Sequence, residues 1–294
     1  MKQILARKTE EINKIIFPFF KFCGGHTSDL AKSMEYSMTA GGKRLRPMMM
    51  RESALLFGKE PDALSTFMAA IEMIHNYSLV HDDLPAMDND MLRHGKPSTH
   101  AVFGEANAIL CGDGLLNIAF ETVIGYAKNH PNENVLDAMY ILASHAGDKG
   151  MIGGQSLDVK FDKSNDKASP EELLYIYENK TGKLIRAALT IGASLNGASK
   201  NDIEKLDKIG ANIGFAFQIV DDILDIEGDE ITIGKPIGSD EKNQKYTYVS
   251  YAGLDNARKE VSNLTDEAID ILMTLPGDKE FLKDLFLYLV KRNM

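Results

Sequence analysis

Two clusters of aspartates are the residues whose types and spacing point most directly to chemistry. The first cluster comprises Asp82, Asp83 and Asp88, and the second comprises Asp221, Asp222 and Asp225. Each cluster ends an apolar run, and a buried carboxylate is costly unless it is paired, protonated or bound to a metal. One such cluster could be a solvated acidic surface, but two favour a site for Mg²⁺, which completes its coordination with water and substrate phosphate oxygens.

The spacing within each cluster indicates how its carboxylates come together. Asp221 and Asp225 are four positions apart, so they share one face of a helix. In the first cluster Pro85 disfavours a continuous helix. Asp82 and Asp88 must therefore converge through a bend in the chain rather than by helical spacing.

Two further polar residues lie on the same predicted helix faces as the aspartates. Gln218 precedes Asp221 by one turn, and His75 precedes Asp82 by two turns. A lone histidine in such a place is more often a satisfied core residue than a ligand. The hypothesis that His75 binds a ligand therefore depends on the basic residues of the chain.

Basic residues gather in short segments, although the net charge of the 294-residue chain is −10. The segments are Gly41-Gly42-Lys43-Arg44-Leu45-Arg46-Pro47, Arg93-His94-Gly95-Lys96-Pro97, Lys180-Thr181-Gly182-Lys183 and the single Lys235. Glycines allow close approach of the backbone to a ligand, and lysine and arginine donate hydrogen bonds to phosphate oxygens. Exposed basic pairs are usually just solvated surface, but basic residues beside both acidic clusters are what metal-bridged diphosphate binding needs.

The rest of the sequence predicts an all-α scaffold that forms one domain over residues 1–294. Apolar residues recur every three or four positions over residues 64–78 and 203–224, and no comparable series of alternating strands is present. Ser169 followed by Pro170 and two glutamates is typical of a helix start. We therefore expect long helices to position the aspartates.

Composition narrows the classes of partner and compartment. No long basic run is present, so a nucleic acid partner is not expected. We expect no signal peptide and no stretch long and apolar enough to span a membrane. Cys23 and Cys111 lack metal-like spacing, and we expect reduced thiols in a cytoplasmic protein, with a disulfide left open.

Taken as an ordered set, these motifs resemble the trans-isoprenyl diphosphate synthases, and especially the bacterial farnesyl diphosphate synthases. The resemblance runs from Gly41 to about Arg258 and includes Gly-Gly-Gln-x2-Asp over residues 153–158. It implies a bundle of long helices around a central cavity, a homodimer, and Mg²⁺-dependent condensation of isopentenyl diphosphate with dimethylallyl or geranyl diphosphate. Three magnesium ions are implied when diphosphate is bound.

The resemblance also implies a role for each site residue. It assigns catalysis to Asp82, Asp83, Lys180, Thr181, Gln218 and Asp221, and metal binding to Asp82, Asp88, Asp221, Asp222 and Asp225. It assigns the binding of isopentenyl diphosphate to Lys43, Arg46, His75 and His94. It assigns the binding of the allylic diphosphate to Arg93, Lys180, Thr181, Gln218 and Lys235. Gln155 and Asp158 match a further motif of the family.

The sequence departs from the family pattern at two positions. His94 stands where the family usually has an arginine that binds isopentenyl diphosphate. Because histidine is often uncharged near neutral pH, we expect weaker binding of this substrate. Asn89 stands where an acid is more usual, which slightly lowers the negative charge beside the metal.

Product length is expected to depend on Tyr77 and Ser78, which lie five and four positions before Asp82. By resemblance, an aromatic floor at Tyr77 favours a C15 product, although Tyr77 could instead be ordinary core packing. The alternatives are a geranylgeranyl or other short-chain synthase, a class I terpene cyclase, a non-catalytic synthase subunit and a helical scaffold protein. The basic turn at residues 41–47 argues against a cyclase, and the intact clusters argue against a non-catalytic subunit.

Overall fold

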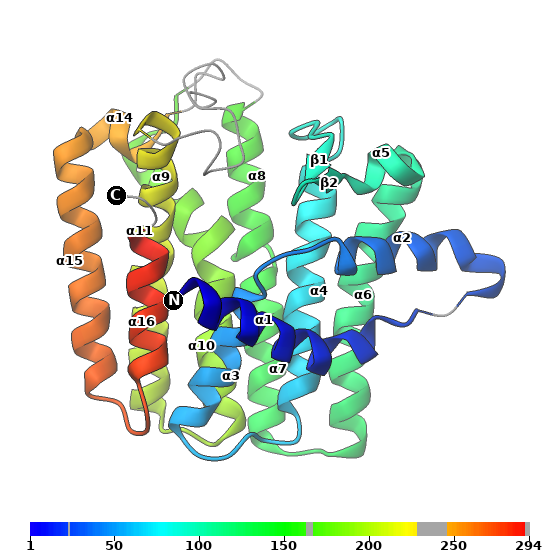
Figure 1. The fold of residues 1–294 in the computed structure, drawn as a ribbon, viewed down its shortest axis with the longest axis horizontal. Coiled ribbons are helices and arrows are strands. Elements are labelled where there is room, and N and C mark those ends of the chain that lie inside the picture. Colours follow the sequence, from blue (N-terminus) through cyan, green and yellow to red (C-terminus); the bar gives the residue numbers. More distant parts are fainter. Residues whose placement is uncertain (23, 163–166, 228–245, 292–294) are drawn as a thin grey trace.

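The computed structural model describes residues 1–294 except 23, 163–166, 228–245 and 292–294, and it is almost entirely helical (Figure 1). The first part of the chain forms α1 (Lys2–Ile16), α2 (Ser28–Thr39), α3 (Leu45–Leu56), α4 (Leu64–Asp82), α5 (Thr99–Phe103), α6 (Glu105–Asn129) and α7 (Glu133–Ala146). The second part forms α8 (Met151–Asp162), α9 (Pro170–Ile176), α10 (Lys183–Leu195), α11 (Lys200–Glu227), α14 (Tyr248–Ala252), α15 (Leu254–Met273) and α16 (Glu280–Val290).

Short elements connect these helices. They are the 3₁₀ helices η1 (Phe17–Phe20) and η2 (Gly25–Thr27), the π-helix η3 (Tyr177–Gly182), and the antiparallel strands β1 (Leu92–Arg93) and β2 (Lys96–Pro97). The predicted all-α fold is confirmed, because β1 and β2 are the only strands in the described ranges.

The long helices run side by side, and α1 and α2 lie across the bundle (Figure 1). Helix α4 packs against α3 and α6, α10 packs against α3, α7 and α11, and α11 packs against α15. Nearly every residue of α10 is buried, which places this helix at the centre of the core. The assignment of the chain to one domain stays a prediction.

The two helices that carry the aspartates form as their sequence periodicity predicts. Phe67, Ile71 and Ile74 of α4 are fully buried, as are Ile209 and Ile213 of α11. This spacing of three and four positions forms one continuous apolar stripe along each helix. Burial of these stripes anchors α4 and α11 and so fixes where the aspartates at their carboxyl ends lie.

The predicted helix start at Ser169 is also confirmed. The Ser169 hydroxyl accepts a hydrogen bond of 3.2 Å from the Glu172 N–H, and the Glu172 carboxylate accepts one of 2.9 Å from the Ser169 N–H. This reciprocal capping box satisfies two backbone donors that a helix start would otherwise leave unpaired. Helix α9 therefore begins at Pro170 and leads directly into η3.

Helix α6 corrects one expectation from the sequence. Its 25 residues include a window with a mean hydropathy of 1.4, so by length and composition alone it could cross a membrane. The expectation that no stretch passes this test was wrong. A core helix passes the same test, and the α6 face that includes Cys111 and Leu115 is fully buried. Cys111 is a free thiol whose pKa burial raises to about 11, and Cys23 lies outside the described residues.

Candidate active site

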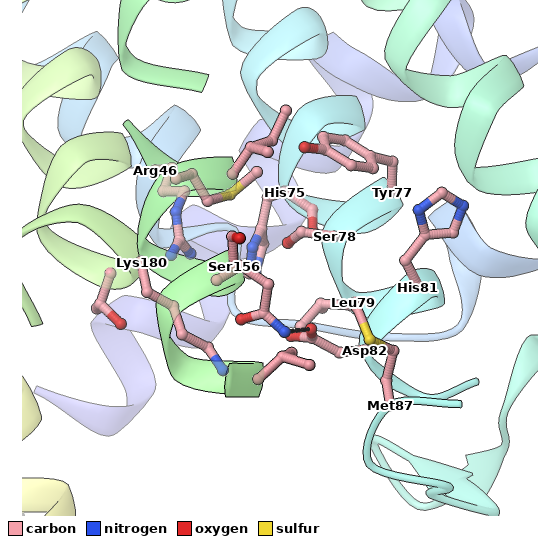
Figure 2. A pocket seen from close by; sticks show the side chains of 15 residues that line it. Arg46, His75, Tyr77, Ser78, Leu79, His81, Asp82, Met87, Ser156 and Lys180 are labelled. Carbon is pink, nitrogen blue, oxygen red and sulfur yellow. Dashed lines mark hydrogen bonds between the residues drawn. The ribbon is translucent and has the colours of Figure 1, made fainter. Parts of the chain in front are cut away.

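A cavity of about 490 Å³ lies between α4, α8 and η3 (Figure 2). The predicted site residues that line it are Arg46, His75, Tyr77, Ser78, Asp82, Lys180 and Thr181. In Figure 2 the Tyr77 ring lies toward the top, and Asp82 and the Lys180 side chain lie toward the bottom. The cavity therefore places charged groups and an aromatic ring in different parts of one space.

The bend predicted in the first aspartate cluster is confirmed. Helix α4 ends at Asp82, and the backbone N–H of Asp88 donates a hydrogen bond of 2.9 Å to the Asp82 carbonyl. The Met87 and Asn89 N–H groups both donate to the Leu84 carbonyl, at 2.9 and 3.1 Å. Asn89 has φ +56°, a left-handed conformation that asparagine adopts more readily than most residues.

The two neighbouring aspartates at the end of α4 have different surroundings. Asp82 lines the cavity, accepts a hydrogen bond from the Gln155 amide, and has a pKa that burial raises to about 6 against the opposing charge of Lys180. Asp83 is 2% exposed and accepts a 2.9 Å hydrogen bond from Arg93 Nε. Burial alone would lower the pKa of Arg93, but its hydrogen bonds to Asp83 and the charge of that carboxylate raise it. Asp83 therefore fixes Arg93 beside the cluster.

The π-helix η3 presents Lys180 and Thr181 to the cavity. Lys180 Nζ donates a 2.6 Å hydrogen bond to Asp158, and the Thr181 hydroxyl donates one of 3.1 Å to Gln218 Oε1. Burial would lower the pKa of Lys180, but the charges of Asp158 and Asp82 raise it, so this side chain is a cation. Such π-turns are frequent at functional sites, and this one lies between α9 and α10.

Two glycines let the neighbouring helices approach η3 closely. A methyl group on Gly154 of α8 would overlap the Lys180 backbone nitrogen, and one on Gly214 of α11 would lie 2.7 Å from Gly182 Cα. Real side chains do not tolerate such distances, so both positions require glycine. The close crossing by α8 places Gln155 against Asp82, and the one by α11 places Gln218 against Thr181.

A buried arginine and a buried histidine form another wall of the cavity. Arg46 Nε is buried without a hydrogen-bond partner among the described residues, and burial lowers the pKa of Arg46 to about 10 against the attraction of Glu72. Burial and the charge of Arg46 hold the pKa of His75 well below its usual value. Because an unpartnered buried donor is costly, an anion bound here would be strongly favoured.

Arg44 is a structural neighbour of this wall and does not line the cavity. Its side chain is 2% exposed and donates to Glu72 at 2.7 Å, to the Met38 carbonyl at 2.6 Å and to Asn13 at 2.9 Å. It takes a left-handed conformation with φ +51° directly before α3. These contacts fix the basic turn that carries Lys43 and Arg46.

Residues 27–282 match the polyprenyl synthetase family. The chain belongs to this family. It is 46% identical to a farnesyl diphosphate synthase of Geobacillus stearothermophilus, over 89% of this chain and 88% of the relative. Geranylgeranyl diphosphate synthases are also among its relatives, at 39–40% identity.

Solved structures of the same fold agree with this assignment. An FPP/GFPP synthase from Zymomonas mobilis has a TM-score of 0.86 and 32% identity, over 98% of both chains. A geranyltransferase from Helicobacter pylori, complexed with magnesium and isoprenyl diphosphate, has a TM-score of 0.81 and 30% identity, over 98% of this chain and 96% of that one. The resemblance stated from the motifs is confirmed.

In this polyprenyl synthetase the second aspartate cluster lies near the carboxyl end of α11. Asp222 is buried, and its carboxylate accepts hydrogen bonds from the Tyr177 hydroxyl at 2.6 Å and the Tyr248 N–H at 3.0 Å. These bonds occupy one oxygen of the Asp222 carboxylate, and the role of Asp222 as a metal ligand stays a prediction. Asp221 and Asp225 are half-buried.

Not every predicted site residue is gathered at the cavity. His94 belongs to the β1–β2 turn with φ +53°, and a methyl group on Gly41 would lie 3.2 Å from its Cβ. It therefore packs on the basic turn that carries Lys43. Lys235 lies outside the described residues. Within the described ranges, no three histidine, cysteine, aspartate or glutamate side chains converge enough to hold a metal unaided.

Sequence reasoning missed most of the wall that α8 contributes. Ile152, Gln155, Ser156 and Val159 line the cavity, and the last three follow Ile152 by three, four and seven positions, which is the spacing of one helix face. That periodicity was available in the sequence, but the mixture of polar and apolar types concealed it. The sequence also gave no role to His81, which lines the cavity beside Tyr77.

Proposed function

We propose that this polyprenyl synthetase condenses isopentenyl diphosphate with dimethylallyl or geranyl diphosphate and releases farnesyl diphosphate. The observation that carries the proposal is that one cavity is lined by three kinds of group. They are the Asp82 carboxylate with the Lys180 ammonium, the buried Arg46 guanidinium whose Nε lacks a partner among the described residues, and the aromatic ring of Tyr77. Two diphosphate groups require metal-binding carboxylates and cations, and the growing apolar chain requires an apolar surface.

The donors present fit magnesium. We propose Asp82, Asp88, Asp221, Asp222 and Asp225 as ligands, and the family pattern implies three ions when diphosphate is bound. Burial and the charge of Asp88 raise the pKa of Asp82, so a bound dication would relieve an existing electrostatic cost. When bound, magnesium neutralises negative charge on the departing diphosphate. Diphosphate oxygens and water would complete its coordination, which agrees with carboxylates that do not form a closed site by themselves.

The allylic diphosphate is proposed to lie against Arg93 and Lys180, and Lys235, which lies outside the described residues, is proposed as a third contact. Arg93 is held by Asp83 and Lys180 by Asp158, so both cations are fixed before the substrate arrives. Preorganised charges of this kind stabilise the charge that develops on a leaving group without further reorganisation.

Isopentenyl diphosphate is proposed to bind Lys43, Arg46, His75 and His94. The buried Arg46 Nε lacks a partner among the described residues, and a diphosphate oxygen would supply one. The buried Arg44–Glu72 ion pair keeps the basic turn in place. The second substrate therefore binds through protein cations.

The reaction follows from this arrangement in three steps. The allylic carbon–oxygen bond breaks and diphosphate departs toward Lys180 and Arg93. The double bond of isopentenyl diphosphate attacks the cation, which the Thr181 carbonyl and the Gln218 amide oxygen face, and a carbon–carbon bond forms. A proton is then lost to the departed diphosphate, because no side-chain base stands out among the site residues. Apolar residues of α8 keep water from the cation.

Tyr77 is the proposed floor for the growing chain, with Ser78 beside it. The Tyr77 ring is buried and lines the same cavity as Asp82, one and a half helical turns earlier on α4. A cavity that ends at Tyr77 suits a C15 product, and a geranylgeranyl synthase would need a cavity that continues past this residue. Tyr77→Ala should therefore lengthen the product.

A second copy of the chain is the proposed partner, and the cytoplasm is the proposed location. Helices α6 and α7 expose Ile109, Leu110, Ile124, Leu136 and Tyr140, with exposed fractions from 41 to 75%. Large exposed apolar side chains on neighbouring helices are typical of a protein interface. A dimer measured by light scattering, and its loss on substitution of Leu110 and Ile124 by aspartate, would support this surface.

The deciding experiment incubates the purified protein with Mg²⁺, isopentenyl diphosphate and either dimethylallyl or geranyl diphosphate, and identifies products by mass. A C15 diphosphate from both starters supports the proposal, and a longer product corrects the chain length. Hydrocarbon from farnesyl diphosphate alone indicates a cyclase. If the folded protein with magnesium does not condense its substrates, the proposal is wrong, and a non-catalytic subunit or a scaffold protein remains.

A further inference from the structure

The Tyr77 ring is held in place by packing. It is 6% exposed, and its hydroxyl has no hydrogen-bond partner in the described part of the chain. Its ring meets the His81 ring edge to face, with centroids 5.8 Å apart and planes at 85°. Figure 2 shows the two rings side by side on successive turns of α4. The orientation of Tyr77 therefore depends on where the imidazole lies.

His81 is itself fixed by the neighbouring helix. Its Nε2–H donates a 3.0 Å hydrogen bond to the Ile109 carbonyl of α6, which requires the tautomer protonated at Nε2. The ring occupies the space that a side chain at position 112 would fill, because a methyl group on Gly112 would overlap it. Asp113 lies 3.9 Å from the same nitrogen.

We propose that His81, seated on Gly112, is a positioning residue that holds Tyr77 across the cavity and so limits product length. The proposal rests on the C15 synthase function proposed above. The chain of contacts runs from the α6 backbone through the imidazole to the phenol ring, and from there to the space for the growing chain. His81 acts on the product through Tyr77, without a bond to either diphosphate.

The test compares product lengths for His81→Ala, His81→Phe and Tyr77→Ala with Mg²⁺, geranyl diphosphate and excess isopentenyl diphosphate. His81→Ala removes the ring contact and should raise the C20 to C15 ratio about tenfold, the effect expected from losing one packing contact in a substrate pocket. His81→Phe keeps an aromatic edge against Tyr77 and should stay closer to C15. His81→Ala added to Tyr77→Ala should lengthen the product no further than Tyr77→Ala does.

Gly112→Ala gives an independent test from the other helix. It leaves His81 and Tyr77 intact, lies outside the residues that line the cavity, and should displace the imidazole and lengthen the product in the same direction. Circular dichroism and the melting temperature check that each variant is folded. If Gly112→Ala does not fold, the His81 variants still decide the question.

The outcomes separate this inference from the function on which it rests. A wild-type enzyme that makes C15, with His81→Ala making longer products, supports both. If the wild type makes C15 and His81→Ala makes only C15 at any rate, the positioning role is overturned while the proposed function stands. If the wild type does not condense the substrates, the proposed function fails first.

Discussion

The backbone N–H of Asp88 donates a 2.9 Å hydrogen bond to the carbonyl of Asp82, so the two ends of the Asp-Asp-x4-Asp segment are joined directly. The intervening residues form a turn around Leu84, because Pro85 prevents the helix from continuing. This closure brings two negative side chains together, and the charge of Asp88 adds to burial in raising the pKa of Asp82. A dication bound between them would remove that repulsion.

The first prediction concerns pH and magnesium. Because the pKa of Asp82 is raised to about 6, protons compete with the cation for this carboxylate below that pH. Activity at low magnesium should therefore fall as the pH decreases through about 6. Higher magnesium should move this acid limb to lower pH, since the metal favours the ionised form.

The measurement is kcat/KM for the allylic substrate between pH 5 and 8 at two magnesium concentrations. A parallel series monitors circular dichroism, so that unfolding in acid is not mistaken for protonation. An acid limb at the same pH for both magnesium concentrations would show that Asp82 does not exchange a proton for the metal.

How much of the site the sequence predicts depends on how far apart the interacting residues lie in the chain. The bend at Pro85, the capping box at Ser169 and the stripes of α4 and α11 are local, and periodicity or turn chemistry predicted each one. The Gln155–Asp82 contact joins residues 73 positions apart, and no local pattern contains it.

The neighbouring aspartates Asp82-Asp83 and Asp221-Asp222 show that local sequence does not predict tertiary contacts even within one motif. Sequence spacing predicts that neighbouring aspartates point in different directions, but it does not say what each one meets. Asp83 meets Arg93, and Asp222 meets Tyr177 and the backbone of Tyr248. Tertiary packing alone determines which protein groups these two aspartates contact.

The second prediction is that His94→Arg lowers the KM for isopentenyl diphosphate. Burial, followed by the charge of Arg93, lowers the pKa of His94, so the imidazole is uncharged near neutral pH. The groups around it are Lys43 and Arg44 of the basic turn and Glu72 of α4. An arginine would donate charge-assisted hydrogen bonds, and the KM should fall about tenfold.

Initial rates against isopentenyl diphosphate at pH 8, with saturating allylic substrate, measure this effect. The KM of the wild type should also fall once the pH is below the ordinary histidine pKa of 6.5, whereas that of the arginine variant should be nearly constant. An unchanged or higher KM in His94→Arg would rule out a substrate contact at this position.

The third prediction is that Gly154→Ala lowers kcat by about a hundredfold, because small displacements of positioned groups have effects of this size. The added methyl group would overlap the Lys180 backbone nitrogen and push α8 away from η3. Both Gln155 and Lys180 would then move relative to Asp82, although no charged group is removed.

The matched control is Gly24→Ala, where a methyl group meets nothing within 4 Å. It should leave kcat within twofold of the wild type. Equal kcat values for Gly154→Ala and the control would mean that the close crossing of α8 and η3 does not set the catalytic geometry.

The fourth prediction concerns the buried pair of Arg44 and Glu72. Their side chains are 2 and 3% exposed, and Arg44 also donates to the Met38 carbonyl and Asn13. Arg44→Met leaves these acceptors and the Glu72 carboxylate without their donor, which should lower the free energy of unfolding by about 3–5 kcal/mol. Arg46 is also attracted by Glu72, so this arginine should be drawn from its substrate position and the KM for isopentenyl diphosphate should rise.

The same substitution at an exposed ion pair provides the comparison. Arg258 pairs with Glu227, and their side chains are 44 and 40% exposed, so Arg258→Met should cost at most about 1 kcal/mol. Urea unfolding measures both variants, and initial rates measure the KM. Similar stability losses in the two variants would show that burial does not increase the contribution of Arg44 to the free energy of unfolding. A large stability loss in Arg44→Met with an unchanged KM would confine this arginine to the scaffold and exclude a role in placing Arg46.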